Sequence, residues 1–528
     1  MKQKKTICLA LSALMCLSIF SMLAACGEKE DSLSVTYPTG EGLSKKAVRV
    51  YNKGNPSKWN MECSHDPVVV EENGTYYSFG TDNFGPFGYQ IRKSTDLMNW
   101  EYVGVAIPEF GQGGSVLEKG REGTSPLQEV YDILAEDAKF DCTTLWAPEV
   151  YPASDGGWWL YGSWTTTFGS SRSVIFQCHA DNVAGPYTYT DTLVVSGKIG
   201  PNAIDASIFE DAEGKLWMSY GSFYSDKFNV LELDKETGLR KDGYTYDDFL
   251  AGTINASAYR GAKLVDIKSS EGSVVTYHTD VPVYGGDITQ GYDETLWKTE
   301  NNYYLMCSNQ ALDRTYNMRT FKSSNPTRGY KSLDGSNGNK ISGSFSWRYD
   351  KDDSSIGYDY FCPGHNDMFR TKEGVNCIAY HNRSQFGNNN HYLFISMYDF
   401  NANGDLVVSP NRYVGESVRT IDAREIYQSS NGKWDMVAIP YSPANKGTDE
   451  KNYASQVVFK EDGTISGSAT GTWQVYGDHY IYLVVNGTKY YGSIMPAYIE
   501  KCARGGLTIS ALDVNGTAIY FNMHFDAE

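Results

Sequence analysis

The sequence predicts an all-β protein: a five-bladed β-propeller followed by a small antiparallel, barrel-like β domain. Three observations support this prediction. Short strands rich in aromatic and β-branched residues dominate the chain, turns of Gly, Asn or Asp separate them, and one hairpin pattern recurs five times. No long helical period stands out among these strands.

The recurring unit is a polar or otherwise distinctive residue, an apolar strand, a turn, and a second aromatic or apolar strand. The first strands begin at residues 65, 146, 205, 293 and 365. Five hairpins of one kind favour a propeller of five blades. A two-sheet sandwich is the alternative, but it would not explain the five-fold recurrence. The turns that separate the paired strands are Asn73-Gly74, Asp155-Gly156-Gly157, Glu213-Gly214, Asn301-Asn302 and Glu373-Gly374.

In such a fold the innermost strand of each blade starts at one central cavity, so residues at equivalent repeat positions converge. The repeat therefore predicts three carboxyl groups, an indole and an imidazole in the same cavity. These positions hold Asp66, Trp146, Asp205, Glu294 (or its neighbour Asp293) and His365.

The N-terminus predicts export. A basic start is followed by an apolar run over residues 7–25 that ends in Ala24-Ala25-Cys26. This is typical of a bacterial lipoprotein signal that is cut before Cys26, whose sulfur is then acylated; an uncleaved membrane anchor is the alternative. We expect a signal peptide at 1–25, a polar tether at 26–48, the propeller at 49–430 and the C-terminal β domain at 431–528. The remainder of the chain would lie outside the cytoplasm, anchored at the cell surface.

Composition excludes some functions. The formal net charge of −18 argues against a nucleic-acid partner, because phosphate binding needs clustered Lys and Arg. The 40 Tyr and 11 Trp residues suit sugar stacking, but strand packing alone can absorb them. Seven cysteines follow Cys26 without a CxxC pair, so a zinc site is not expected and an odd thiol remains.

The repeat lapses after about residue 431, and a second pattern of strands begins there. Strands over 471–476 and 480–485, then a turn at Asn486-Gly487 into 489–492, predict a separate antiparallel domain. Trp473, Tyr490 and Tyr491 are aromatic residues that could bind sugar, although ordinary core packing is the favoured interpretation.

The motifs of the repeat resemble those of glycoside hydrolase family 43, and within it most closely the endo-acting arabinanases. The resemblance extends from about Ser64 to Arg424, with one motif in each blade. The residues that carry it are His65-Asp66-Pro67, Trp146-Ala147-Pro148-Glu149, Asn202-Ala203-Ile204-Asp205, Thr315-Tyr316-Asn317-Met318-Arg319, Pro363-Gly364-His365-Asn366 and Tyr380-His381.

The resemblance implies three catalytic carboxyl groups. Asp66 would be the general base that deprotonates the attacking water, and Asp205 would orient the general acid and hold its pKa up. Glu294 would be the general acid. Here the sequence departs from the family, which has Ala or Gly and then Pro after this Glu, where this chain has Thr295-Leu296. Asp293 therefore stays open as an alternative.

The same resemblance implies a calcium ion near the active site, held by His365 directly or through water, with water supplying most of the other ligands. A buried histidine with a purely structural role is the alternative. Trp146 would stack on sugar and Asn202 would hydrogen-bond to it, while Tyr316 and Asn317 are weaker candidates.

The function that the resemblance implies is an inverting endo-α-1,5-L-arabinanase, a monomer acting on arabinan or a related plant polysaccharide. Three alternatives remain. The chain could be an exo-acting arabinofuranosidase or β-xylosidase of the same family, an invertase-like retaining enzyme, or a non-catalytic surface lipoprotein that captures oligosaccharides.

Overall fold

The computed structural model describes most of the chain from Leu33 onward. The chain divides at Thr36 into two units, and the second unit, Tyr37–Glu528, contains the strands described below. No helix in the part of the chain that the structure describes is long and apolar enough to cross a membrane. The described ranges are 33–41, 64–82, 87–108, 110, 126–136, 144–166, 172–196, 203–221, 227–266, 274–284, 297–310, 312, 314–335, 337–349, 359–383, 391–440 and 452–526.

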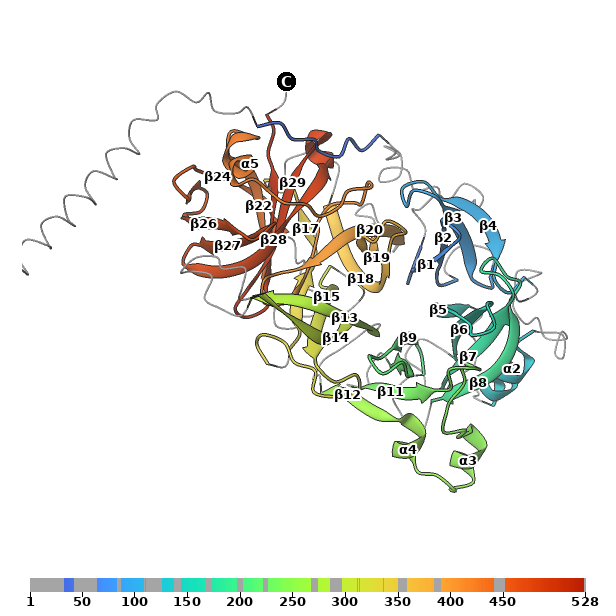
Figure 1. Cartoon of the computed structure of the whole chain (residues 1–528). Coiled ribbons are helices and arrows are strands. Elements are labelled where there is room, and N and C mark those ends of the chain that lie inside the picture. The colour runs from blue at the N-terminus through green and yellow to red at the C-terminus, as the bar shows by residue number, and fades with distance from the viewer. Residues whose placement is uncertain are drawn as a thin grey trace, which may run out of the picture. The chain divides into compact units, whose positions relative to one another are not determined.

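Five antiparallel sheets follow one another along the chain and form the propeller (Figure 1). The four strands of each blade pair in sequence order, and the fifth sheet is extended by β17 (Phe345–Ser346) and by β23 (Asn452–Tyr453), which pairs with β17 in parallel. Blade 1 contains β1 (Val68–Glu72), β2 (Thr75–Phe79), β3 (Gln90–Ser94) and β4 (Glu101–Val105), and blade 2 contains β5 (Leu145–Pro152), β6 (Trp158–Thr165), β7 (Ser173–Ala180) and β8 (Thr188–Val195).

The remaining blades repeat this plan. Blade 3 contains β9 (Ser207–Glu210), β10 (Leu216–Tyr220), β11 (Lys227–Leu233) and β12 (Ala262–Asp266), with the short helices α3 (Tyr246–Leu250) and α4 (Ala256–Arg260) before β12. Blade 4 contains β13 (Val274–Tyr284), β14 (Trp297–Asn309), β15 (Asn317–Ser323) and β16 (Asn339–Ser342). Blade 5 contains β18 (Asp359–Arg370), β19 (Asn376–Arg383), β20 (His391–Phe400) and β21 (Leu406–Val408), with β17 (Phe345–Ser346) beside β18.

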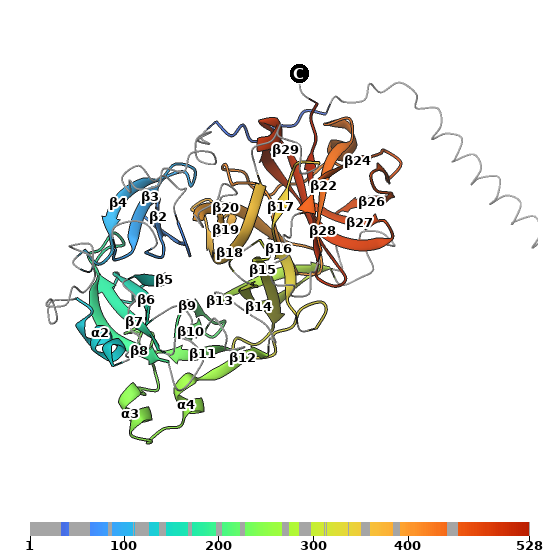
Figure 2. The ribbon, with the colours of Figure 1, turned by 180° about the vertical axis from the view of Figure 1, so that it is seen from behind.

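The first strands of the blades form the inner ring. β1 contacts β5, β5 contacts β9, β9 contacts β13, β13 contacts β18, and β18 contacts β1, so the ring closes between the first and last blades. Figure 2 shows the same succession of sheets from behind. The expected five-bladed propeller is therefore confirmed.

The fourth blade corrects one part of the expected repeat. Its inner strand is β13, which starts at Val274, and Trp297 begins the second strand, β14. The expected turn at Asn301-Asn302 lies inside β14, where Asn301 pairs with Asp280. The hairpin turn thus lies before Trp297, because Tyr284 pairs with Trp297. Glu294 and Asp293 lie outside the described residues, in the segment that joins β13 to β14.

An eight-stranded closed barrel comes after the propeller, as expected for a barrel-like domain. Asn486 and Gly487 adopt left-handed backbone conformations at the predicted turn between β27 (Tyr480–Val485) and β28 (Thr488–Ile499). The barrel interior is filled by side chains, and Trp473 is among them, which supports packing as its role. The barrel strands are β22 (Lys433–Ile439), β24 (Ser455–Phe459), β25 (Thr464–Gly467), β26 (Gly471–Tyr476), β27 (Tyr480–Val485), β28 (Thr488–Ile499), β29 (Arg504–Asp513) and β30 (Ala518–Met523).

The propeller and the barrel share a buried seam. Barrel residues such as Ile439 and Tyr520 pack in one apolar cluster with residues of blades 4 and 5. A buried ion pair crosses the seam: Arg412 donates from Nε and Nη2 to the two carboxylate oxygens of Glu500, at 2.6 and 2.8 Å. Parallel, two-point contacts of this kind fix orientation as well as distance.

Glu416 near this seam gives a pH-dependent prediction. Its side chain is buried, one carboxyl oxygen accepts the N–H of Val414 at 2.7 Å, and the other has no partner among the described residues. Burial raises the pKa of Glu416 from 4.5 to about 7. Because the pKa of Glu416 is raised in the folded state, its protonated carboxyl group is compatible with the folded protein below pH 4.5. The stability of the fold falls as the pH rises from 4.5 toward 7, where the buried group must ionise.

We therefore expect Glu416→Gln to be more stable than the wild type at pH 8 and close to it at pH 5. The pKa difference bounds the effect at about 3 kcal/mol. Urea unfolding at both pH values measures the difference. Equal stability changes at pH 5 and pH 8 would contradict a buried proton on Glu416.

Candidate active site

Four inner strands share an unusual backbone conformation at one equivalent position, which precedes β1 and β9 and lies within β5 and β18. Asp66, Ala147, Asp205 and His365 have φ angles of 51°, 24°, 58° and 46°, in the left-handed region that residues with a side chain rarely adopt. Each lies two residues before a paired strand residue, namely Val68, Glu149, Ser207 and Asp367. Strained backbone at one equivalent step of four blades indicates a functional constraint there.

The second blade corrects the expected position of Trp146. Ala147, and not Trp146, occupies the position equivalent to Asp66, because the register of β5 against β6 shifts between Trp146 and Glu149. Trp146 instead pairs with Ser163, and its carbonyl oxygen accepts a hydrogen bond from the Tyr89 hydroxyl at 2.8 Å. Its side chain is half-buried.

A hydrogen bond from the preceding blade holds each of these four backbones. The N–H of Ala147 donates to Thr81, that of Asp205 to Ser163, that of His365 to Ser308, and that of Asp66 to His381, over 2.8, 3.2, 2.7 and 3.4 Å. The acceptors lie within two residues of the ends of the second strands of blades 1, 2, 4 and 5. We call these four bonds the blade latches. The equivalent residue of blade 3, Gly221, has no side chain with which to form one.

Asp66 is in close contact with four side chains. Its Oδ1 lies 3.0 Å from His365 Nδ1, 3.2 Å from His65 Nε2 and 3.5 Å from His381 Nδ1. Its Oδ2 accepts a hydrogen bond from the Thr81 hydroxyl at 2.5 Å. The structure thus brings Asp66 and His365 into direct contact.

These contacts keep Asp66 ionised. Burial alone would raise its pKa, but His365 and His65 outweigh burial and hold the pKa of Asp66 well below 3.8. Burial alone would also lower the pKa of His365, yet the carboxylates of Asp66, Asp205 and Asp367 raise it above 6.5. An ionised carboxylate held in this way is able to accept a proton.

Asp205 acts electrostatically on the same groups as Asp66. Its charge raises the pKa of both His365 and Tyr316, as does that of Asp66. Tyr316 is buried and stacks on His381 with the ring centres 5.9 Å apart. Two of the three predicted carboxyl groups therefore converge around one imidazole. Asn202, like Glu294, lies outside the described residues.

Three histidines behind Asp66 form a cluster that was not expected from the sequence. His65 stacks on His391 with ring centres 3.8 Å apart, and His381 meets His391 edge-on at 4.5 Å. Burial lowers the pKa of His65 to about 3 and that of His381 to about 4, so both rings are neutral near pH 7. The neutral ring of His65 can donate from Nε2 to the Asp66 carboxylate, whereas Nδ1 of His381 accepts the backbone N–H of Asp66.

The spacing of this cluster alone would suit a metal ion, since its ligand atoms lie within 4.8 Å of one another. The surroundings of the cluster do not suit a metal ion. Arg383 donates from Nε to His391 Nε2 at 2.9 Å, which places the proton of the neutral ring on Nδ1 and a guanidinium charge beside the site. We therefore interpret the cluster as support for Asp66.

The fourth blade has its own start, which sequence reasoning placed too late. In each other blade, the residue two positions before the latch position pairs with a residue of the inner strand. The position equivalent to Asp66 lies two residues before that inner-strand residue. Ser308 is the latch residue of blade 4, Met306 precedes it by two, and Met306 pairs with Val275. The equivalent position is Ser273, in the sequence Glu271-Gly272-Ser273 that comes immediately before β13. These three residues lie outside the described part of the structure, but Glu271 is the carboxyl residue of this segment.

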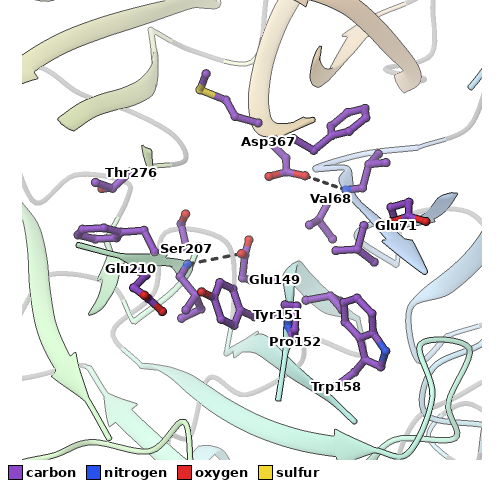
Figure 3. Close-up of a pocket in the computed structure, with 17 residues that line it drawn as sticks. Val68, Glu71, Glu149, Tyr151, Pro152, Trp158, Ser207, Glu210, Thr276 and Asp367 are labelled. Carbon is purple, nitrogen blue, oxygen red and sulfur yellow. Dashed lines mark hydrogen bonds between the residues drawn. The ribbon is translucent and has the colours of Figure 1, made fainter. Parts of the chain in front are cut away.

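Further along the inner strands the axis widens into a cavity of about 340 Å³ (Figure 3). The carboxyl groups of Glu149 and Asp367 point into it. Asp367 accepts the N–H of Val69 at 2.8 Å and Glu149 that of Ile208 at 3.4 Å, so each carboxyl joins two neighbouring blades. Burial, together with the repulsion from Asp367, raises the pKa of Glu149 well above 4.5. This pair is a structural feature of the axis.

Comparisons with known proteins agree with this architecture. Residues 61–284 match the model of glycosyl hydrolases family 43, and residues 410–521 match a C-terminal lipocalin-like domain of that family. An extracellular endo-α-(1→5)-L-arabinanase 2 of Bacillus subtilis is 27% identical over 86% of this chain and 92% of its own length. A similar protein from Thermotoga petrophila is 26% identical over 86% of this chain and 92% of its own length.

Solved structures of similar proteins superpose on most of the chain. The crystal structure of an endo-1,5-α-L-arabinanase from Thermotoga petrophila superposes with a TM-score of 0.67 and 26% identity, and covers 87% of this chain and 98% of that one. A family 43 glycoside hydrolase from Bacillus licheniformis gives a TM-score of 0.65 at 26% identity, over 87% of this chain and 97% of that one. The propeller and both domain matches show that the chain is a glycoside hydrolase that carries a catalytic-domain match to family 43 and the C-terminal domain of that family.

Proposed function

We propose that the protein is an endo-α-1,5-L-arabinanase that hydrolyses internal bonds of arabinan with inversion. The observation that carries the proposal is the buried, ionised carboxylate of Asp66 at the start of β1, with Asp205 acting electrostatically on the same imidazole. The substrate is suggested by the relatives of similar length, which are named as arabinanases. Water attack on a glycosidic bond requires this kind of carboxylate opposite a second carboxyl group that is protonated.

In the proposed reaction Asp66 takes a proton from a water molecule while the water oxygen bonds to the anomeric carbon. The bond from that carbon to the leaving oxygen breaks, and a general acid protonates the leaving oxygen. Asp205 acts on the general acid through its negative charge, because a nearby like charge raises the pKa of a carboxyl group. Trp146 and Asn202 would contact the sugar, and their roles stay predictions.

The register of blade 4 bears on the identity of the general acid. Glu294 comes after the inner strand β13 in the chain, whereas Glu271 comes just before it, as Asp66 and Asp205 come before β1 and β9. The Gly272 that follows Glu271 also fits the family pattern of Ala or Gly after the acid better than Thr295 does. We therefore propose Glu271 as the general acid, with Glu294 and Asp293 as the alternatives.

Product analysis on debranched arabinan tests both assignments. We expect the wild type to release a ladder of arabino-oligosaccharides and Asp66→Asn and Glu271→Gln to lose activity by a factor of at least about 100, because each loses a proton-transfer group. Glu294→Gln serves as the matched control and should keep most of the activity. Circular dichroism of each variant checks that the fold is intact.

The other outcomes separate the alternatives. Loss of activity in Glu294→Gln but not in Glu271→Gln would return the acid role to Glu294. Release of arabinose alone would indicate an exo-acting enzyme. A wild type that binds but does not cleave arabinan or xylan would favour the non-catalytic binding protein.

We also propose that calcium binds at His365. Nδ1 of this ring contacts Asp66, whereas Nε2 has no partner among the described residues. Asp66, Asp205 and Asp367 surround the ring with negative charge. This donor set fits a cation completed mainly by water, which calcium tolerates. When bound, calcium would supply positive charge that offsets the repulsion between these carboxylates.

Thermal unfolding with calcium and with EDTA checks this site without relying on activity. We expect calcium to raise the Tm of the wild type by a few degrees, since a ligand that binds the folded state stabilises it. The shift should disappear in His365→Ala. An equal shift in the two proteins would contradict His365 as the ligand.

The N-terminal motif and the names of the relatives support a location outside the cytoplasm. We propose that the chain is a monomer anchored by a lipid on Cys26. Fatty-acid labelling of the wild type and of Cys26→Ser tests the anchor, and no label in the wild type would exclude it.

A further inference from the structure

Thr81 contacts two parts of the active site through one hydroxyl group. Its Oγ1 accepts the N–H of Ala147 at 2.8 Å and donates to Oδ2 of Asp66 at 2.5 Å. Thr81 itself is buried, and its own N–H donates to the carbonyl oxygen of His65 at 2.8 Å. The residue is therefore fixed from both its backbone and its side chain.

The direction of the hydroxyl proton follows from these contacts. A threonine hydroxyl has one proton to donate and two lone pairs to accept with. The backbone N–H of Ala147 uses a lone pair, and the ionised carboxylate of Asp66 is the acceptor for the proton. Hydrogen bonds to a charged group are stronger than those between neutral groups, so the carboxylate plane is held firmly.

The two oxygens of Asp66 are held differently. Oδ1 faces three imidazole nitrogens at 3.0–3.5 Å, from His365, His65 and His381. The Thr81 hydroxyl is the contact that orients Oδ2. We infer that Thr81 is a positioning residue that aims Oδ2 of Asp66 at the attacking water, and that Oδ2 is the atom that takes the proton.

The same hydroxyl couples the base to the residue beside the sugar. Ala147 directly follows Trp146, the predicted stacking residue. Thr81 therefore sets the distance between the base and the backbone that carries Trp146. Ser163 and Ser308 latch Asp205 and His365 in the equivalent way, but through the backbone N–H of the residue whose side chain acts in the site.

The inference rests on the proposed function, because it assigns the proton acceptor of that reaction. In the step, an O–H bond of water breaks and its proton goes to Oδ2. The water oxygen forms a bond to the anomeric carbon, and the general acid supplies the proton of the leaving group. No other reactant is required.

Kinetics of Thr81→Val and Thr81→Ser on arabinan test the role. Valine keeps the shape and removes the hydroxyl, so we expect kcat to fall about 10- to 100-fold with KM within about twofold, as for loss of one hydrogen bond to a charged group. Serine keeps the hydroxyl and should restore kcat to within about threefold of the wild type.

Thr276→Val is the matched control. Thr276 is also buried on an inner strand, and its hydroxyl donates to Ser219 at 3.0 Å without contacting a carboxylate. We expect its kcat to stay within about twofold of the wild type. A purely structural role for Thr81 would lower the Tm of Thr81→Val and leave its kcat unchanged at temperatures below unfolding.

Crystal structures of the two Thr81 variants add a readout that does not depend on the substrate. The Asp66 carboxylate should rotate in Thr81→Val and keep its orientation in Thr81→Ser. An unchanged carboxylate in the valine variant, an unchanged kcat, or a serine variant as slow as the valine variant would overturn the inference. If the wild type were inactive on arabinan, the proposed function would fail while the carboxylate orientation still decided the role of Thr81.

Discussion

The four blade latches are the interactions on which the site depends. A latch holds the backbone of a residue before or within an inner strand, in a left-handed conformation that residues with a side chain rarely adopt. Because the acceptor belongs to the preceding blade, each latch also fixes the angle between two blades. Packing of the sheets therefore positions Asp66, Asp205 and His365 together, although 139 residues separate the first two (205 − 66). The same hydrogen bonds therefore hold the site residues in place and join the neighbouring blades.

Asp66 and Glu149 are both buried, but their surroundings shift the pKa values of the two carboxyl groups in opposite directions. Asp66 is surrounded by imidazole nitrogens and a hydroxyl, so it stays ionised. Glu149 has one backbone N–H and a second carboxyl group nearby, so burial keeps it protonated to higher pH. The axis therefore holds an ionised carboxylate at Asp66 and carboxyl groups of raised pKa at Glu149 and Asp367.

Much of the fold could be predicted from the sequence, because each blade carries a local signal. Four of the five predicted hairpin turns lie between the first and second strands of their blades, at Asn73-Gly74, 155–157, Glu213-Gly214 and Glu373-Gly374. The turn prediction for blade 4 was wrong because its first two strands are long, at 11 and 13 residues. Asn301-Asn302 resembles a turn in the sequence but lies inside β14. The misplaced turn also put the start of the blade after β13, which is why Glu294 was the carboxyl residue chosen from the sequence. Trp146 was misplaced by one residue because a register shift leaves no clear mark in the sequence.

The residues that surround and hold Asp66 could not be predicted from local patterns in the sequence. His65, His381 and His391 come from blades 1 and 5, and only closure of the ring brings them together. Thr81 lies 15 residues after Asp66 and carries no motif of its own. Such residues act through contacts that the tertiary structure creates, so neither their periodicity nor their spacing gives a signal.

The stereochemistry of the first product tests the central claim most directly, because it reports how water reaches the anomeric carbon. Proton NMR of arabino-oligosaccharide hydrolysis, recorded before the anomers equilibrate, measures it. If Asp66 activates water opposite the general acid, the α-linked substrate must give the β-anomer first. An initial α-anomer would show that a carboxylate of the enzyme attacks the sugar itself, and would contradict the role assigned to Asp66.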